Sequence, residues 1–324
     1  MFELEAATHG RPLSTLAYFL MSSTGLLATF KLPGVKVARF LRAVEAGYRP
    51  NPYHNKVHAA DVLQTLHVVL TKGGVLAAIP SPLTHLACYV AAVSHDYEHV
   101  GLNNDFLINT NDQLARIYND KSPMENHHLA AMFGLLRQDE LNFVAQLPKA
   151  ELVQLRQMVI ELVLATDMKQ HFAAVSHFMA LYRLAPLRGP VHDLIAITLA
   201  PPPPPPAPPP IALKLSDLGH LAEELHVHSR WVSALEEELY RQGDREKAAG
   251  LPISPLFDRT KPGVSKSQVG FMDFVVVPLF HSFVRAFPST QPMFHQLALN
   301  YRHWETQRWC RALRAPDPMA ISTA

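Results

Sequence analysis

The segment "HAADVLQTLHVVL" (58–70) decides the fold class, because its apolar residues recur at spacings of three and four. These residues share one helical face: Ala59, Val62, Leu63, Leu66 and Val69. The same period runs through residues 151–168 and 229–244, and the second of these predicted helices is expected to end at Gly243. No apolar stretch shows clean period-two alternation, and no Asn-Gly turn joins apolar segments. The sequence therefore predicts an all-α fold of many helices.

Local signals place one helix start and two further core helices. In "KSPMENHH" (121–128), Ser122 is predicted to be the N-cap, a proline follows at the first turn, and Glu125 lies three residues after the cap. The apolar segment 16–30 is too short and too rich in Ser and Thr to span a bilayer. Segment 271–284 is interrupted by Asp, Pro and His. We expect both segments to be core helices and no membrane-spanning segment.

Composition indicates a globular chain with a sizeable core. Of 324 residues, 48% are hydrophobic and 18% charged, which is typical of folded rather than disordered proteins. The net charge of +1 argues against nucleic acid as a partner. Cys88 and Cys310 match no disulfide framework or zinc motif, which favours a reducing compartment. The start of the chain lacks the basic region of a signal peptide, so we expect a cytoplasmic protein.

One low-complexity segment interrupts the helical pattern. The tract "PPPPPPAPPP" (201–210) is expected to be extended polyproline II or disordered. It could mark a domain linker or bind a proline-binding module, but a tolerated insertion in a surface loop, 200–211, is favoured because loop insertions cost little stability. We therefore expect one domain over residues 1–314 and a disordered tail at 315–324.

Histidine is clustered, and one cluster has helical spacing. His54 and His58 lie four residues apart, so both would point into one cavity if a helix begins near Pro52. A neutral imidazole is a metal ligand and a protonated one is a general acid, so the two residues can divide these roles. Taken alone, this spacing indicates surface or core polarity more often than a site.

An adjacent His-Asp pair strengthens the case for a metal site. His95 and Asp96 end the apolar segment 86–96, and His99 follows closely. An Asp can bridge two cations in a dinuclear site, and a buried carboxylate needs a partner. The alternative is a charged helix terminus that faces solvent. Asp217, an isolated acid in the apolar segment 211–221, is the candidate fourth ligand, with an N-cap or surface acid as its alternative.

Six motifs in order resemble one protein family. They are "YHNKVHAADV" (53–62), "HDYEHVG" (95–101), "YNDKSPMENHH" (118–128), "VLATDM" (163–168), "RQGDREKAAGLPISPLFDR" (241–259) and "SQVGFMDFVVVP" (267–278). From about residue 2 to about residue 300 the chain resembles the catalytic domain of class I cyclic-nucleotide phosphodiesterases. It is most similar to the calmodulin-stimulated, dual-specificity subfamily. The resemblance implies an all-α, HD-type phosphohydrolase domain that converts cAMP or cGMP to the 5′-monophosphate.

The resemblance also implies a two-metal site. Four residues match the ligands of the first metal, usually Zn²⁺: His58, His95, Asp96 and Asp217. Asp96 would also approach the second metal, usually Mg²⁺ or Mn²⁺. Four more match groups that orient the water shell of the second metal: His99, Glu125, Thr166 and Asp167. His54 matches the residue that protonates the leaving O3′ as metal-activated hydroxide attacks.

Other matched residues are expected to contact the nucleotide. Gln268 matches the glutamine that hydrogen-bonds the purine, while Phe271 and Leu235 match the two sides of a hydrophobic clamp on the base. Taken alone, Phe271 indicates core packing, and only its "SQVGF" context favours the clamp. Tyr53 is also assigned to substrate binding. His220 stands where dual-specificity members carry His and cAMP-selective members often carry Asn, which favours hydrolysis of both nucleotides.

Two departures from the family keep other functions open. The family usually has helices ahead of the part that resembles residue 2, which suggests a truncated product or a fragment. The proline tract lies where the family has ordered chain before the Asp217 helix. A catalytically weak scaffold is therefore one alternative. An HD-type phosphohydrolase acting on another nucleotide is a second, although "SQVGF" and "ATDM" argue against it.

Overall fold

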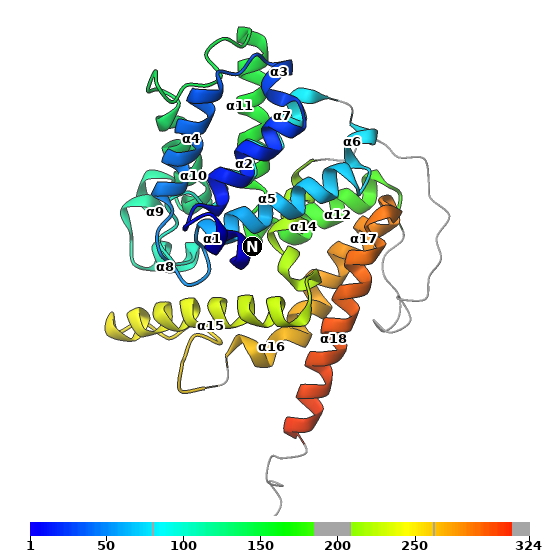
Figure 1. The fold of residues 1–324 in the computed structure, drawn as a ribbon. Coiled ribbons are helices and arrows are strands. Elements are labelled where there is room, and N and C mark those ends of the chain that lie inside the picture. The colour runs from blue at the N-terminus through cyan, green and yellow to red at the C-terminus, as the bar shows by residue number, and fades with distance from the viewer. Residues whose placement is uncertain (80, 185–208, 262, 313–324) are drawn as a thin grey trace, which may run out of the picture.

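The computed structural model describes residues 1–324 apart from 80, 185–208, 262 and 313–324. Every regular element in these described residues is helical, as the sequence predicts (Figure 1). The elements are α1 (Phe2–Ala7), α2 (Pro12–Ser23), α3 (Leu26–Thr29), α4 (Gly34–Gly47), α5 (Lys56–Thr71), α6 (Val75–Ala78), α7 (Pro82–Ser94), α8 (Asn104–Asn109), α9 (Gln113–Ile117), α10 (Pro123–Leu135), α11 (Lys149–Leu164), η1 (Met168–Gln170), α12 (His171–Leu181), α14 (Pro209–Asp217), η2 (Gly219–Ala222), α15 (Leu225–Ala248), α16 (Val264–Phe271), the π-helical η3 (Met272–Val276), α17 (Val277–Ala286), η4 (Pro288–Thr290) and α18 (Gln291–Ala312).

Helices α5 and α7 form the centre of the core. α5 packs against α2, α7 and α14, and α7 packs against α11. All five apolar residues that define the helical face of 58–70 are completely buried. α7 carries an almost unbroken run of buried residues from Leu83 to Ser94, so its C-terminal end delivers the next residues into the interior. The His58 and His95–Asp96 positions are therefore held at the ends of two helices that pack in the core.

A second group of helices covers one side of this core. The long helix α15 lies across the lower part of Figure 1, where α16 packs against both α15 and α18. Among the described residues, only Val264–Ala286 is long and apolar enough to cross a membrane by length and composition. Of its most apolar window, 61% is buried in the protein, which is typical of a core helix. Segment 271–284 is thus packed inside the fold, as expected.

The predicted end of a helix at Gly243 is wrong. α15 continues through this residue to Ala248. Gly243 is needed for close packing instead, because a Cβ at this position would collide with the backbone carbonyl of Phe257. Glycine inside a helix costs about 1 kcal/mol relative to alanine, but here it allows the loop after α15 to fold back against the helix.

The predicted helix start at 122–123 is confirmed, but the predicted cap is not. α10 begins at Pro123, whereas Ser122 adopts a left-handed conformation with φ of 43° and makes no side-chain cap. Its hydroxyl instead donates a hydrogen bond of 2.6 Å to Oδ2 of Asp167. The serine therefore ties the start of α10 to the segment after α11, a long-range contact that a local capping rule does not include.

The helix that follows the proline tract begins earlier than predicted. Its last two residues, Pro209 and Pro210, begin α14, where the missing N–H groups of proline cost nothing. Ile211 is 2% exposed and belongs to the core, so the predicted loop boundary at 211 is wrong. Residues 201–208, and with them the proposed docking tract, lie outside the described residues, as does the predicted tail at 315–324.

Candidate active site

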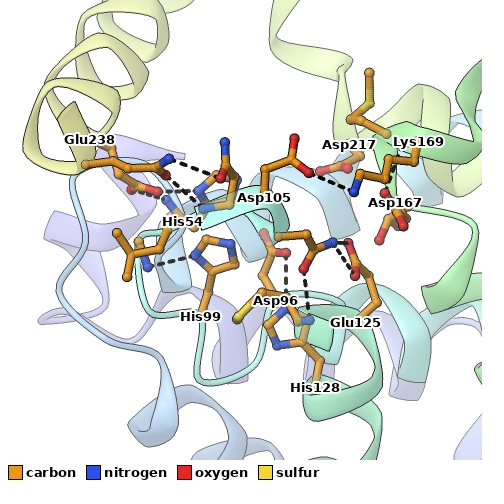
Figure 2. Close-up of a pocket in the computed structure, with 18 of the residues that line it drawn as sticks. His54, Asp96, His99, Asp105, Glu125, His128, Asp167, Lys169, Asp217 and Glu238 are labelled. Atoms are coloured by element: carbon orange, nitrogen blue, oxygen red, sulfur yellow. Dashed lines mark hydrogen bonds and ion pairs between the residues drawn. The ribbon is translucent and has the colours of Figure 1, made fainter. Parts of the chain in front are cut away.

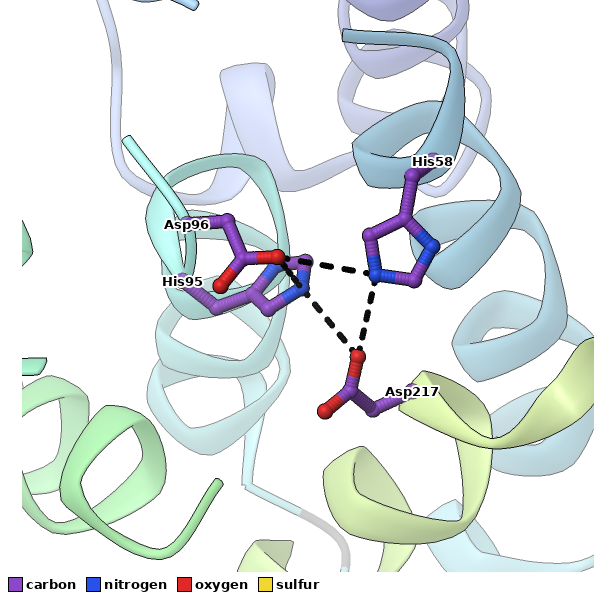
Figure 3. Close-up of side chains that lie close together, drawn as sticks. All are labelled: His58, His95, Asp96 and Asp217. Atoms are coloured by element: carbon purple, nitrogen blue, oxygen red, sulfur yellow. Dashed lines mark hydrogen bonds and ion pairs between the residues drawn. The ribbon is translucent and has the colours of Figure 1, made fainter. Parts of the chain in front are cut away.

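Four predicted ligands converge on one point from three elements (Figure 3). His58 comes from the first turn of α5, His95 and Asp96 from the C-terminal end of α7, and Asp217 from the last residue of α14. Nε2 of His58 lies 3.1 Å from Oδ1 of Asp217 and 3.6 Å from Oδ2 of Asp96. Nε2 of His95 lies 3.3 Å from Oδ2 of Asp96 and 3.4 Å from Oδ1 of Asp217. The helix packing thus assembles two imidazoles and two carboxylates around one position.

The polar atoms of this cluster fit a divalent metal ion. Nε2 of His95 and Oδ2 of Asp96 are buried and have no hydrogen-bond partner among the described residues. Nδ1 of His95 donates to the carbonyl of Ala92 at 2.9 Å, which leaves the lone pair on Nε2 facing the cluster. Burial alone would raise the pKa of Asp96, but the neighbouring histidines hold it well below its usual value. Two nitrogens and two carboxylate oxygens form a donor set that suits zinc.

Asp96 also lies close to two further imidazoles, those of His99 and His128. Asp96, His99 and His128 form another group whose ligand atoms lie within 4.8 Å of one another. Nδ1 of His128 donates to the carbonyl of Tyr97, and its Nε2 lies 3.9 Å from Oδ1 of Asp96. Burial lowers the pKa of His99 to about 3 and that of His128 to about 4, so both rings are neutral. His128 lies within the quoted motif 118–128, but no local pattern in the sequence singles it out.

His54 is brought to the site by a different route from the one predicted. α5 begins at Lys56 with Asn55 as its N-cap, so His54 precedes the helix and does not share a helical face with His58. The two rings are nevertheless 5.8 Å apart, and His54 stacks on His99 at 4.1 Å. The predicted proximity is correct, but the predicted shared helix is wrong because the Asn55 side chain caps the first turn.

Glu238 of α15 holds His54 in place. Its Oε1 lies 2.5 Å from Nδ1 of His54, and its Oε2 accepts hydrogen bonds from the backbone N–H groups of Tyr53 and His54 at 2.9 and 3.0 Å. Burial alone would lower the pKa of His54, but the Glu238 carboxylate and nearby Asp96 raise it to about 9. Burial would likewise raise the pKa of Glu238, yet His54 lowers it to about 2. At neutral pH this dyad is an imidazolium–carboxylate pair that leaves Nε2 of His54 free.

The sequence reading missed Glu238, and little in the sequence marks it. Glu236, Glu237 and Glu238 are consecutive on α15, and only Glu238 is fully buried. Only its contact with His54, which lies 184 positions away in the sequence, distinguishes Glu238 from the two glutamates before it.

These groups border a cavity of about 320 Å³ (Figure 2). His54 and Glu238 lie at one end, and Glu125, Asp167 and Lys169 at the other. Six carboxylates line it: Asp96, Asp105, Glu125, Asp167, Asp217 and Glu238. Among the described residues, Lys169 is the only Lys or Arg that lines it, and its Nζ is paired with Asp105 at 2.7 Å. Such an acidic cavity would repel an anion unless cations were also bound.

The predicted residues around the second metal position all line the cavity. His99, Glu125, Thr166 and Asp167 are among its walls. Burial raises the pKa of Glu125 to about 7, although Asn104 donates to its Oε2 at 2.9 Å. One oxygen of Asp167 accepts the hydrogen bond from Ser122 and the other accepts from the N–H of Lys169.

A buried lysine supports this wall from behind. Lys214 lies one turn before Asp217 on α14 and is 1% exposed. Its Nζ donates to the carbonyls of Thr166 and Asp167 at 3.2 and 3.3 Å. Burial lowers the pKa of this ammonium. Lys214 therefore links the α14 ligand to the opposite wall, a role that the sequence did not reveal.

The predicted base-binding residues lie on a different pair of helices. Gln268 and Phe271 belong to α16, Leu235 belongs to α15, and none of them lines the cavity described above. Nε2 of Gln268 donates to the carbonyl of Val264 at 3.3 Å, while its buried Oε1 has no partner in the described part of the chain. α15 and α16 pack together, and Leu235 also packs against the buried cluster that contains Tyr53.

His220 is held by a chain of aromatic donors. Trp304 of α18 donates through Nε1 to Nε2 of His228 at 2.8 Å. The remaining proton of neutral His228 is then on Nδ1, which lies 3.2 Å from Nδ1 of His220. Burial lowers the pKa of both rings. The His220 ring lies 5.8 Å from Tyr53, which in turn contacts His54 and His58.

Comparison with known proteins identifies close relatives. Residues 53–297 match the family model described as 3′5′-cyclic nucleotide phosphodiesterase. The human dual specificity calcium/calmodulin-dependent 3′,5′-cyclic nucleotide phosphodiesterase 1B is 42% identical over 283 residues, 86% of this chain and 50% of the relative. A probable 3′,5′-cyclic phosphodiesterase of Caenorhabditis elegans is 38% identical over 279 residues, 86% of this chain and 40% of the relative. The chain thus spans about half the length, or less, of these curated relatives.

A solved structure agrees in fold. The phosphodiesterase domain of the RhoPDE fusion protein from the choanoflagellate Salpingoeca rosetta superposes with a TM-score of 0.80 and 27% identity. The alignment covers 93% of this chain and 92% of that domain.

Proposed function

The chain belongs to the 3′,5′-cyclic nucleotide phosphodiesterase family, and we propose that it hydrolyses cAMP and cGMP to the 5′-monophosphates. The observation that carries this proposal is the juxtaposition of the His58/His95/Asp96/Asp217 cluster with the His54–Glu238 dyad in one acidic cavity. A phosphodiester anion needs charge neutralisation, an in-line nucleophile and a proton for the leaving oxygen. These two clusters offer places for all three.

We assign the metal positions as follows. His58, His95, Asp96 and Asp217 would hold Zn²⁺, since nitrogen and oxygen donors at a closed position suit that ion. The oxygen-rich region beyond Asp96, toward Glu125 and Asp167, would hold Mg²⁺ or Mn²⁺ with bound waters. When bound, such ions neutralise the phosphate and lower the pKa of a coordinated water.

The side chains of the chain itself carry the proton chemistry. His54 presents Nε2–H to the cavity because Glu238 holds Nδ1 and stabilises the imidazolium. In this proposal His54 donates a proton to the departing O3′. His99, Glu125, Thr166 and Asp167 would orient waters through the polar atoms that they turn to the cavity.

Base recognition is assigned to the α15–α16 side. We propose that the unpartnered amide oxygen of Gln268 accepts a hydrogen bond from the purine, while Phe271 and Leu235 cover its two faces. Tyr53 would line the route between this side and the metals. We further propose that His220 permits both nucleotides.

The whole region 1–314 is proposed to be one catalytic domain. One continuous core cluster runs from Leu13 in α2 to Trp304 in α18, which supports a single folding unit on both sides of the undescribed segment 185–208.

The proposal is tested by measuring cAMP and cGMP hydrolysis by the purified chain after chelation and after return of Zn²⁺ with Mg²⁺ or Mn²⁺. We expect 5′-nucleotide production that depends on added metal, with turnover of both nucleotides. A folded, metal-loaded chain that turns over neither nucleotide would instead favour the scaffold alternative.

A further inference from the structure

Asp61 is a buried acid that the proposed chemistry does not use. It lies on α5, one turn after His58, and is 2% exposed. No N–H or hydroxyl donor among the described residues reaches its Oδ1. No ion pair joins it to a Lys, Arg or His in the described part of the chain either. A buried carboxylate without a partner is costly, so the group it faces decides its charge state.

The group that Asp61 faces is a second carboxyl group. Glu223 follows η2, which packs against α5, and no donor among the described residues reaches its buried Oε2. A side-chain interaction between the two carboxyl groups raises the pKa of Asp61. Asn300 of α18 fixes this turn, because its Nδ2 donates to the carbonyls of Leu221 and Glu223 at 2.9 and 2.7 Å. The two acids therefore cannot easily separate.

Few charges offset the pair. The Met1 amino group acts on Asp61 from the start of the chain, and the phenol of Tyr53 faces it from the loop before α5. From the other elements packed on α5, namely α2, α6, α7 and α14, no charged side chain acts on Asp61 in the described residues. Asp61 is buried and Glu223 is half-buried with its Oε2 atom covered, so the two carboxyl groups cannot both ionise at little cost.

We propose that Asp61 and Glu223 form a carboxylic acid–carboxylate pair that shares one proton at neutral pH and acts as a pH-sensitive latch between α5 and the η2 turn. The proton is held between two oxygens that otherwise lack donors. Loss of this proton places two negative charges between the helix that carries His58 and the turn that carries His220. The latch is independent of the proposed hydrolysis.

The pair makes stability depend on pH with a defined sign. Burial, followed by the nearby Glu223 charge, raises the pKa of Asp61 well above 3.8. The folded chain then binds more protons than the unfolded chain above that pH, so stability falls as pH rises toward the raised pKa. Removing one acid should abolish this fall.

The test compares thermal unfolding of the full metal-loaded chain from about pH 5 to about pH 9 for wild type, Glu223→Gln and Asp61→Asn. Glu224→Gln is the matched control, because the Glu224 side chain is 79% exposed and adjacent in sequence. We expect Glu223→Gln to raise the melting temperature relative to wild type by about 2–4 °C at alkaline pH and far less at acidic pH. The control should follow wild type throughout.

A second measurement does not depend on the stability of the variants. Infrared difference spectra of the wild-type chain should show the carbonyl band of a protonated carboxylic acid at neutral pH. This band should disappear on alkaline titration and be missing from the spectra of Asp61→Asn, which distinguishes it from a band of Glu125. Absence of this band overturns the proposal. It is also overturned if Glu223→Gln lowers the melting temperature at alkaline pH, since that result would mean that both acids are ionised around a bound cation.

Discussion

The two clusters of histidine and carboxylate in the active site differ in whether their polar atoms already have partners. In the His58/His95/Asp96/Asp217 cluster, Nε2 of His95 and Oδ2 of Asp96 are buried and unsatisfied. In the His54–Glu238 dyad, both oxygens of Glu238 accept hydrogen bonds and Nδ1 of His54 is paired. Buried polar groups are expensive without partners. The first cluster, in which only His58 and Asp217 are hydrogen-bonded to each other, is therefore compatible with a bound metal ion, whereas the second already satisfies its own polar atoms.

The strongest challenge to the first cluster is Asp96→Ala. Asp96 faces both His95 and the His99/His128 side, so its removal should release bound metal and lower kcat/KM by roughly a thousandfold or more. Metal content and nucleotide hydrolysis are measured on the same preparation. Asp139→Ala is the control, since Asp139 is an exposed acid far from the cavity lining. A variant that keeps its metal and its activity would contradict the assignment.

His54→Ala should separate the two clusters. Because His54 is not among the four converging ligands, metal content should remain while kcat falls by about 10²–10⁴-fold through loss of the proton donor. Metal analysis beside steady-state kinetics provides the comparison. If the variant loses metal to the same extent as activity, the two clusters do not have separate roles.

Glu238→Gln tests the electrostatics of the dyad. Burial would lower the pKa of His54, but the Glu238 carboxylate raises it to about 9. The neutral amide introduced by Glu238→Gln should therefore lower this pKa. An acid that must be protonated loses activity as pH rises through its pKa, and the alkaline limb of the kcat profile should move to lower pH, with roughly tenfold loss near neutrality. Glu237→Gln, on the exposed face of α15, is the control. An unmoved alkaline limb would count against the role of Glu238.

The same dyad predicts a stability effect of known sign. Its ionised form stabilises the fold fully between about pH 4.5 and about pH 6.5, the ordinary pKa values of glutamate and histidine. This contribution is lost as pH rises through about 9 or falls through about 2, which thermal unfolding across pH measures.

The smallest expected effect is that of Gln268→Ala. Gln268 lies on α16, away from both clusters, so the variant should raise KM for cAMP and cGMP by roughly tenfold with little change in kcat. Gln157→Ala, at an exposed position of α11, is the control. Unchanged KM values for both nucleotides would argue that the purine is bound elsewhere.

Much of the fold could be predicted because helix formation depends on near neighbours. The spacing in 58–70 and the apolar run before His95 follow from side chains within one or two turns, and the structure places both as helices. Local rules failed where a distant group competed. The Ser122 hydroxyl donates a hydrogen bond to Asp167 instead of capping α10. Gly243 does not end a helix, because its role is to allow close packing against the backbone of Phe257.

The sequence by itself determined the helical class, the ligand types and the family, since these reside in short patterns such as His95–Asp96 and the segment 53–62. Only the tertiary structure decided which acids act. Chain packing brings Glu238 rather than Glu237 into contact with His54. It also brings Asp61 close to a second acid, Glu223. The reason is physical: a carboxyl group takes its charge and its partner from burial and from groups that chain packing brings within a few ångströms, and sequence spacing records neither.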